Sequence, residues 1–347
     1  RDVERSRGLG DVYKRQEDLE AVALAEVSGK PMVAYCGQLP GAQPNEIRVA
    51  VARNERPEQG DWDIYRVHEA YGSVDICEVQ GRPAVVYLAG DPEGPENVST
   101  LWYSMNTEPD GSGEWQEVEV AQAYTESSGE GFYNLSLSVF DGRPAVVYSL
   151  HDEGVRRLYF AIADTADGLG SWTSNLIIQY FLPVFGAPTG IQGSHSVAEV
   201  DGRPAVATYY IHKLLPTWDC EAEMKYLICD TADGMGEWRE TTVYPRTANV
   251  GFDVATSLAV IDGKPVLVFG DFGTDYEPYR GALFCFTCDS ADGLGKWERG
   301  SLVDPIGGGN PLLFHLADDT PYIVYKHPER LDPELLYQLV YAKWYEY

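Results

Sequence analysis

The sequence contains no apolar run of about 18 residues, the length that a membrane-spanning helix needs, and it carries little positive charge. Its 26 Lys and Arg stand against 54 Asp and Glu, which gives a formal net charge of −28. The missing apolar run predicts a chain without a membrane span. The excess of carboxylates predicts a surface that repels nucleic acids and anionic membranes, so we expect no nucleic-acid partner.

Cysteine is also scarce, and its spacing predicts no disulfide framework. Cys229 and Cys288 occupy equivalent strand positions in successive repeats, too far apart for a bridge. Cys285 and Cys288 are three residues apart on one predicted strand and face opposite ways. None of the remaining three, Cys36, Cys77 and Cys220, has an evident partner. We expect most of these residues to be buried free thiols, which leaves the compartment undecided.

The first 16 residues differ from the rest of the chain. They are rich in Arg and Lys and show neither strand nor helix periodicity. A DNA sequence that encodes Asp11–Gln16 resembles the transposon end used to build sequencing libraries. We interpret residues 1–16 as a sequencing-adaptor artefact and exclude them from the fold. The alternative is a genuine disordered tail.

Internal repetition is the main feature of the remaining chain. A pattern such as EVQGRPAVVY, which starts at Glu78, occurs six times and is marked by Pro31, Pro83, Pro144, Pro204, Pro265 and Pro321. A second pattern, such as TADGLGSW, ends at Trp172, Trp238 and Trp297, with weaker forms ending at Trp62 and Trp115. The period of 50 to 60 residues indicates a repeat architecture.

Each repeat is predicted to form four short antiparallel strands. Asp-Gly and Ser-Gly dipeptides allow the positive φ angles of a two-residue hairpin, and the proline after the turn is tolerated at the start of a strand. The fourth strand begins at the Trp. Four strands per repeat without any helical segment predict an all-β fold, a six-bladed β-propeller. A solenoid is the alternative.

We place the propeller at residues 17–347, with blades at about 17–71, 72–122, 123–180, 181–245, 246–304 and 305–347. The last repeat stops where its fourth strand should begin. In a closed ring the N-terminal segment commonly donates that strand and removes the open edges. We therefore expect the last blade to be incomplete in this chain.

The Trp pattern resembles the Asp-box, the bacterial neuraminidase repeat. Ser290, Asp292 and Trp297 keep its spacing, except that glycines lie one and three residues after the Asp instead of two. The whole unit is similar to uncharacterised bacterial propeller repeats of predicted secreted proteins, which implies an extracellular or cell-surface location. The resemblance implies that the box residues are structural, with Asp accepting hydrogen bonds in the turn and Trp packing between sheets: Asp167, Trp172, Asp233, Trp238, Asp292 and Trp297.

A sialidase-like enzyme would need an arginine cluster, a Tyr beside a carboxylate and an Asp as acid or base. Its first-blade Phe/Tyr-Arg-Ile-Pro motif is absent. Arg82, Arg143 and Arg203 fall in the Gly-Arg-Pro turns, where we expect them to be solvated on the wrong face. Arg156 and Arg280 fall in loops between second and third strands, where they could bind an anion or form ordinary ion pairs.

The same loops carry His151, His212 and His327 at equivalent positions, with Asp271 in a similar place. Blade geometry separates such positions, so that only inward-leaning side chains could share one metal ion; we expect polar loop residues and no metal. A further loop, Gln179–His195, presents Tyr180 and Phe185, which could line a mouth for sugars or a peptide, or fold back onto its own blade.

From the sequence we expect a monomeric, non-catalytic binding or scaffold protein without a cofactor, whose ligand is a carbohydrate or a protein. Its contacts would come from the loop residues His151, His212, His327, Asp271, Tyr180, Phe185, Arg156 and Arg280. The alternative is a sialidase-like glycoside hydrolase, which rests largely on fold analogy.

Overall fold

A computed structural model of the chain describes residues 19–37, 46–54, 57, 60–70, 72–90, 98–124, 131–152, 155–181, 195–214, 220–245, 256–272, 281–300, 309–315, 321–328 and 337–343. The regular secondary structure of these residues consists of β-strands alone, so the all-β prediction is confirmed. No helix long and apolar enough to cross a membrane occurs in these residues. The segment 1–16 lies outside them.

The chain forms two compact units. The N-terminal unit comprises Arg5–Glu153 and Arg157–Ile178, and the C-terminal unit consists mainly of Gln179–Tyr347. Each unit is built from antiparallel sheets in which sequence neighbours pair, as the repeats predict.

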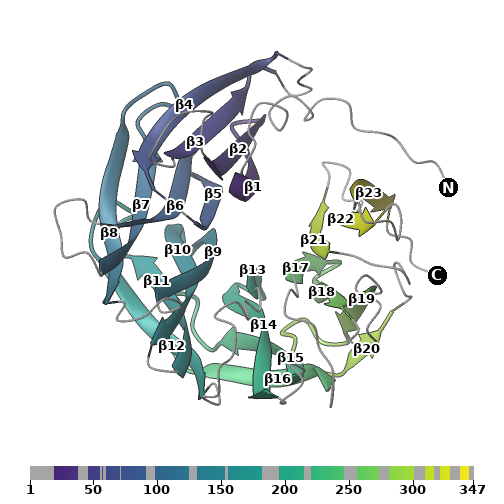
Figure 1. Ribbon diagram of the computed structural model, residues 1–347. Helices are drawn as coiled ribbons and strands as arrows, with labels where there is room; N and C mark the ends of the chain where they lie inside the picture. Colours follow the sequence, from purple (N-terminus) through teal and green to yellow (C-terminus); the bar gives the residue numbers. More distant parts are fainter. Residues whose placement is uncertain are drawn as a thin grey trace. The chain divides into compact units, whose positions relative to one another are not determined.

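The N-terminal unit contains three four-stranded sheets, drawn from purple to teal in Figure 1. Their strands are β1 (Leu19–Val27), β2 (Lys30–Gly37), β3 (Glu46–Ala52), β4 (Trp62–Glu69), β5 (Val74–Val79), β6 (Arg82–Gly90), β7 (Val98–Asn106), β8 (Trp115–Tyr124), β9 (Gly131–Phe140), β10 (Arg143–Asp152), β11 (Val155–Ala163) and β12 (Trp172–Phe181). The first strands of successive sheets, β1, β5 and β9, lie side by side along the inner side of the unit (Figure 1).

The C-terminal unit contains two four-stranded sheets and one sheet in which three strands are described. Their strands are β13 (His195–Val200), β14 (Arg203–Leu214), β15 (Cys220–Cys229), β16 (Trp238–Pro245), β17 (Thr256–Ile261), β18 (Lys264–Phe272), β19 (Gly281–Cys288), β20 (Trp297–Arg299), β21 (Gly309–His315), β22 (Pro321–Pro328) and β23 (Tyr337–Lys343). Here β17 lies beside both β13 and β21.

Apolar side chains from facing sheets form the cores. In the N-terminal unit one cluster joins Ala34 and Val49 of the first sheet to Tyr87 of the second. In the C-terminal unit another joins Tyr226 to Phe269 and Phe286 of the next sheet. All five described cysteines are free thiols, and four of them are buried, as expected.

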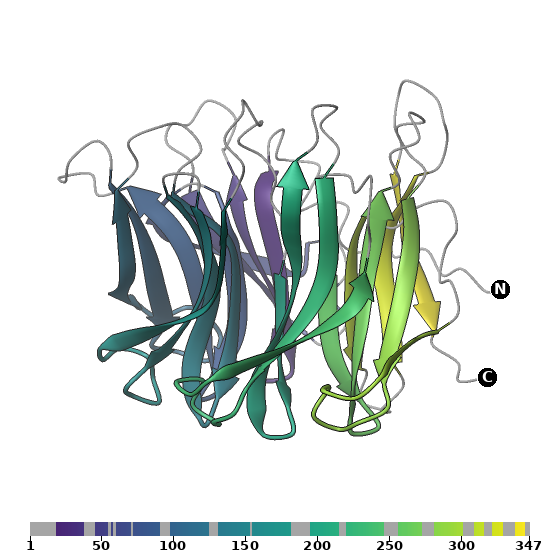
Figure 2. The ribbon, with the colours of Figure 1, turned by 90° about the horizontal axis from the view of Figure 1, so that it is seen from below.

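The hairpins between first and second strands have the predicted geometry. Asp141 and Gly142 have φ values of +51° and +71°, and Asp201 and Gly202 have +51° and +70°. Two successive positive φ angles match the right-handed twist of the strands and hold each hairpin in register. Within each unit, these turns and the turns between third and fourth strands lie at one end, which we term the turn end (Figure 2). The opposite end is the loop end.

The Asp-box turns join third to fourth strands, as predicted. Asp167 accepts hydrogen bonds from the Leu169 amide (3.1 Å) and the Thr165 hydroxyl (2.7 Å), and the Thr165 oxygen accepts the Gly170 amide (3.0 Å). A Cβ on Gly170 would lie 2.0 Å from the Asp164 carboxylate. The glycine three residues after the Asp is therefore required by the packing of the turn itself.

A tyrosine from the preceding sheet seals two of these turns. The Tyr103 hydroxyl donates to the carbonyl of Asp167 (2.9 Å), and its ring packs on Trp172 with centroids 5.2 Å apart. Tyr226 makes the same contacts with Asp292 (3.1 Å) and Trp297 (5.2 Å). In these two boxes the Trp ring and the backbone carbonyl of the Asp contact the neighbouring sheet, which is consistent with the structural role that the resemblance implies.

Candidate functional site

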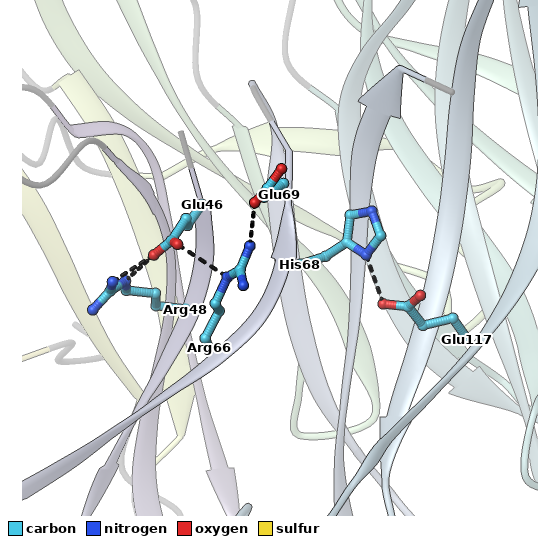
Figure 3. A network of polar contacts seen from close by, with 6 residues as sticks. All are labelled: Glu46, Arg48, Arg66, His68, Glu69 and Glu117. Carbon is cyan, nitrogen blue, oxygen red and sulfur yellow. Dashed lines mark hydrogen bonds and ion pairs between the residues drawn. The ribbon is translucent and has the colours of Figure 1, made fainter. Parts of the chain in front are cut away.

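A polar network links the first two sheets (Figure 3). His68 of β4 contacts Glu117 of β8, with 3.0 Å between His68 Nδ1 and Glu117 Oε1. The same carboxylate oxygen accepts a hydrogen bond from the buried hydroxyl of Tyr87 at 2.7 Å. The His68 ring stacks on Tyr87, with centroids 5.5 Å apart. A tyrosine beside a carboxylate is one element of the sialidase-like alternative.

The electrostatics of this network do not produce a nucleophile. Burial, and then the neighbouring Glu117 carboxylate, raise the pKa of Tyr87 well above its usual range. Burial alone would raise the pKa of Glu117, but hydrogen bonds from His68 and Tyr87 hold that pKa below its ordinary value. The hydrogen bond to Glu117 raises the pKa of His68. Tyr87 therefore keeps its proton, and the network is suited to joining two sheets.

Four further charged residues in Figure 3 belong to the outer strands of the first sheet. Glu46 binds both Arg48 and Arg66, with 3.0 Å between Arg66 Nε and Glu46 Oε1. Arg66 also pairs with Glu69 at 2.6 Å. About half of the Arg66 side chain is exposed, so these pairs contribute little to stability. The four charged side chains are paired with one another and lie away from the inner strand β1.

The inner edge of the second sheet carries a different kind of carboxyl group. Asp75, the second residue of β5, accepts the backbone amide of Leu137 in β9 through Oδ2 (2.7 Å) and that of Ile76 through Oδ1 (2.9 Å). Burial raises the pKa of Asp75 to about 6, although both hydrogen bonds oppose the rise. Asp75 lies where β5 enters from the loop end, so it combines an inner position with an unusual proton affinity.

The structure describes two of the predicted ligand-binding side chains. His151 lies half-buried near the loop end of β10, and Arg156 is buried at the start of β11. Arg157, next to it, pairs with Asp152 at 3.2 Å. His212, His327, Asp271 and Tyr180 fall within β14, β22, β18 and β12, but their side chains lie outside the described part, as do Phe185 and Arg280 entirely. Their role as ligand contacts stays a prediction.

The arginines of the Gly-Arg-Pro turns lie at the turn end, as predicted. Arg143 pairs with Asp141 at 3.3 Å and donates to the Ala163 carbonyl, and Arg203 pairs with Asp201 at 2.9 Å. Their side chains are only 26% and 21% exposed, so the expectation that they are solvated is wrong. No group of three metal-ligating side chains occurs within the described ranges.

Sequence reasoning missed Asp75 and the His68–Glu117 pair. One signal was available for Asp75, because the residue six positions before the hairpin glycine is Ser136, Ser196 or Ser257 in three other repeats. Aligning the repeats shows that Asp75 is the only acidic residue at this position, where the other five repeats have serine, alanine or leucine. The His68–Glu117 contact joins residues 49 positions apart and has no local signal.

Comparison with known proteins detects the fold and not a sequence family. No family model matches the chain, and no curated protein matches it. Among solved structures, the GH93 α-L-arabinofuranosidase of Fusarium graminearum, in complex with arabinobiose, is similar with a TM-score of 0.64 and 12% identity, over 98% of this chain and 97% of that one. The α-L-arabinanase of Penicillium chrysogenum, complexed with arabinobiose, gives 0.62 and 12%, over 94% and 93%.

The NanB sialidase of Streptococcus pneumoniae is also similar, with a TM-score of 0.59 and 10% identity over 98% of this chain and 70% of that one. These neighbours are β-propellers, so the propeller-like fold is supported over nearly the whole chain. They are also glycoside hydrolases. This finding contradicts the expectation of a non-catalytic binding or scaffold role.

Proposed function

We propose that this protein is a glycoside hydrolase built on a six-bladed β-propeller, and that it cleaves a neutral, arabinose-containing glycan. The observation that carries the proposal is the agreement of fold with an arabinofuranosidase and an arabinanase over at least 93% of both chains in each pair. The sialidase extends well beyond the matched region and gives a lower TM-score, so it supports the reaction type more than the substrate.

The sheets and the repeats taken together support the proposal of six blades. Five sheets have four strands, the sixth has three described strands, and each sheet contains one copy of the proline-marked hairpin. In a propeller the first strands are the inner strands of the blades, and we place the active site at the loop end of the inner strands β1, β5 and β9 of the N-terminal unit.

Charge favours a neutral substrate over a sialylated one. A chain with a net charge of −28 repels anionic sugars unless cations are gathered at the site. A sialic acid carboxylate is best held by several arginines. Among the described arginines, Arg66, Arg157 and Arg203 are each bound to a neighbouring carboxylate instead.

Product analysis tests the proposal directly. The purified protein is incubated with linear arabinan, arabinobiose, an aryl α-L-arabinofuranoside and sialyllactose, and the products are identified by mass spectrometry, with heat-denatured protein as the control. We expect arabinose or arabino-oligosaccharides from the first three substrates only. Release of sialic acid would replace the proposed substrate but keep the reaction class. If all four substrates remain uncleaved, and the glycans of an array remain uncleaved as well, the proposal is contradicted.

A further inference from the structure

Asp75 occupies a place where two inner strands meet. Its strand β5 contacts both β1 and β9, the first strands of the adjacent sheets. The Leu137 and Ile76 amides that donate to its carboxylate belong to first strands, which pair with their own sheet along one edge only. Amides that donate to a side chain here point away from their ladder partners. The carboxyl group therefore lies at the free inner edge, between β5 and β9.

Three other sheets place a serine at this strand position. Ser196 in β13 accepts a hydrogen bond from Thr256 in β17 at 3.3 Å, which joins two inner strands of the C-terminal unit without any charge. Among the inner-strand side chains that the structure describes, the other acidic ones, Glu26, Glu78 and Glu199, are exposed and lie at the turn end. Asp75 is thus the one described carboxyl group at the loop end of an inner strand.

We infer that Asp75 is the proton-transfer group of the hydrolase site; the inference rests on the proposed function. A carboxylate has about four acceptor positions, and the two amides occupy two of them. Among the described residues no further hydrogen bond occupies the remaining positions, and Asp75 is partly exposed, so these positions are available to a substrate oxygen. The two amides also fix the orientation of the carboxyl group, as a catalytic group requires.

The reaction balances with Asp75 as acid and then base. Protonated Asp75 gives its proton to the glycosidic oxygen as the bond from that oxygen to the anomeric carbon breaks. The bonding electron pair leaves with that oxygen, so the anomeric carbon carries positive charge, as an oxocarbenium ion, until a water molecule adds to it and loses a proton to the Asp75 carboxylate. One water molecule is consumed for each bond cleaved. A pKa of about 6 makes both steps accessible near neutral pH.

The experiment compares Asp75→Asn with Ser196→Ala on two substrates. Arabinobiose has a poor leaving group that needs a proton, whereas a dinitrophenyl α-L-arabinofuranoside has a leaving group that does not. We expect Asp75→Asn to lower kcat on arabinobiose by about 100-fold or more and to affect the dinitrophenyl substrate far less. Ser196→Ala, which removes the polar group at the same strand position elsewhere, should leave both rates unchanged.

The outcomes separate three cases. Equal losses on both substrates, or no loss on either, would overturn the assignment while leaving the proposed function intact. A wild-type protein that cleaves no glycan would overturn the proposed function and the assignment with it. If Asp75→Asn does not fold, the wild-type pH profile decides: kcat on arabinobiose should fall as the pH rises through about 6, and a rate that stays constant there would contradict the role of Asp75.

Discussion

Replacing Gly293 by Ala tests the contact that seals an Asp-box turn against the preceding sheet. Gly293 has a φ of +74°, and a Cβ built on it would lie 2.4 Å from ring atoms Cε1 and Cζ of Tyr226 and 2.6 Å from the Tyr226 hydroxyl. The Tyr226 ring is fully buried, packs on Trp297 and donates to the Asp292 carbonyl. It cannot withdraw without losing these contacts.

Gly263 provides a matched control in the same sheet. Its φ is +71°, but a Cβ there would meet no atom within 4 Å. Gly263→Ala therefore carries only the cost of a left-handed backbone, about 1 to 2 kcal/mol. Gly293→Ala adds the cost of overpacking, about 1 to 3 kcal/mol. We expect Gly293→Ala to lower the free energy of unfolding by about 2 to 5 kcal/mol in total, clearly more than the control.

Urea unfolding of the wild type, both single variants and a Tyr226→Ala background measures these costs. Truncating Tyr226 opens the space that the new methyl group needs. In that background the cost of Gly293→Ala should fall to that of Gly263→Ala, a non-additivity of about 1 to 3 kcal/mol. Equal costs for the two glycines in the wild-type background would refute the steric reasoning.

Three further predictions follow from individual contacts. Trp172→Phe removes the donor of the hydrogen bond from Nε1 to the Gly168 carbonyl (2.9 Å). In urea unfolding it should cost about 1 kcal/mol more than Trp115→Phe, because the buried Trp115 nitrogen has no hydrogen-bond partner to lose. Equal costs for the two variants would contradict this. His68→Phe keeps a ring on Tyr87 but removes the contact with Glu117. Because folding raises the pKa of His68, the contact stabilises the fold by about 1 kcal/mol or less in acid, and this contribution is lost as the pH rises through that pKa. The difference in free energy of unfolding between wild type and variant should therefore shrink with rising pH. Asp75→Ser removes a carboxyl group whose pKa rises from 3.8 to about 6 on folding. The free energy of unfolding of the wild type should therefore fall by about 3 kcal/mol relative to that of the variant as the pH rises from about 4 to 7. Parallel pH profiles of unfolding for the two proteins would show that folding does not raise the pKa of Asp75.

The local structure was largely predictable from the sequence because it depends on residues close together in the chain. The hairpins required positive φ at pairs such as Asp141 and Gly142, and the structure has them. Strands β12, β16 and β20 begin at the Trp of each box, as predicted. The glycine pattern that departs from the usual Asp-box has a steric cause, since Gly170 leaves room for Asp164. Turn chemistry and period alone account for these features.

The contacts between sheets were not predictable in the same way. Asp75 bonds an amide 62 residues away, and Tyr103 bonds a carbonyl 64 residues away. Repeat spacing shows that successive sheets are neighbours but not which side chains meet across them. The histidine positions drew attention because they recur, whereas Asp75 is notable because it departs from the repeat.

The two carboxylates of the N-terminal unit show how electrostatics separates a structural role from a functional one. Hydrogen bonds lower the pKa of Glu117, and burial raises the pKa of Tyr87. At neutral pH Glu117 is therefore ionised and Tyr87 is protonated, which are the states that stabilise the fold. Around Asp75, burial raises the pKa to about 6, so the ionised form opposes folding at neutral pH by about 3 kcal/mol. A serine, as at Ser196, could join inner strands without that cost. A structural bridge alone does not explain a carboxyl group there, whereas proton transfer requires a group whose two protonation states are both accessible.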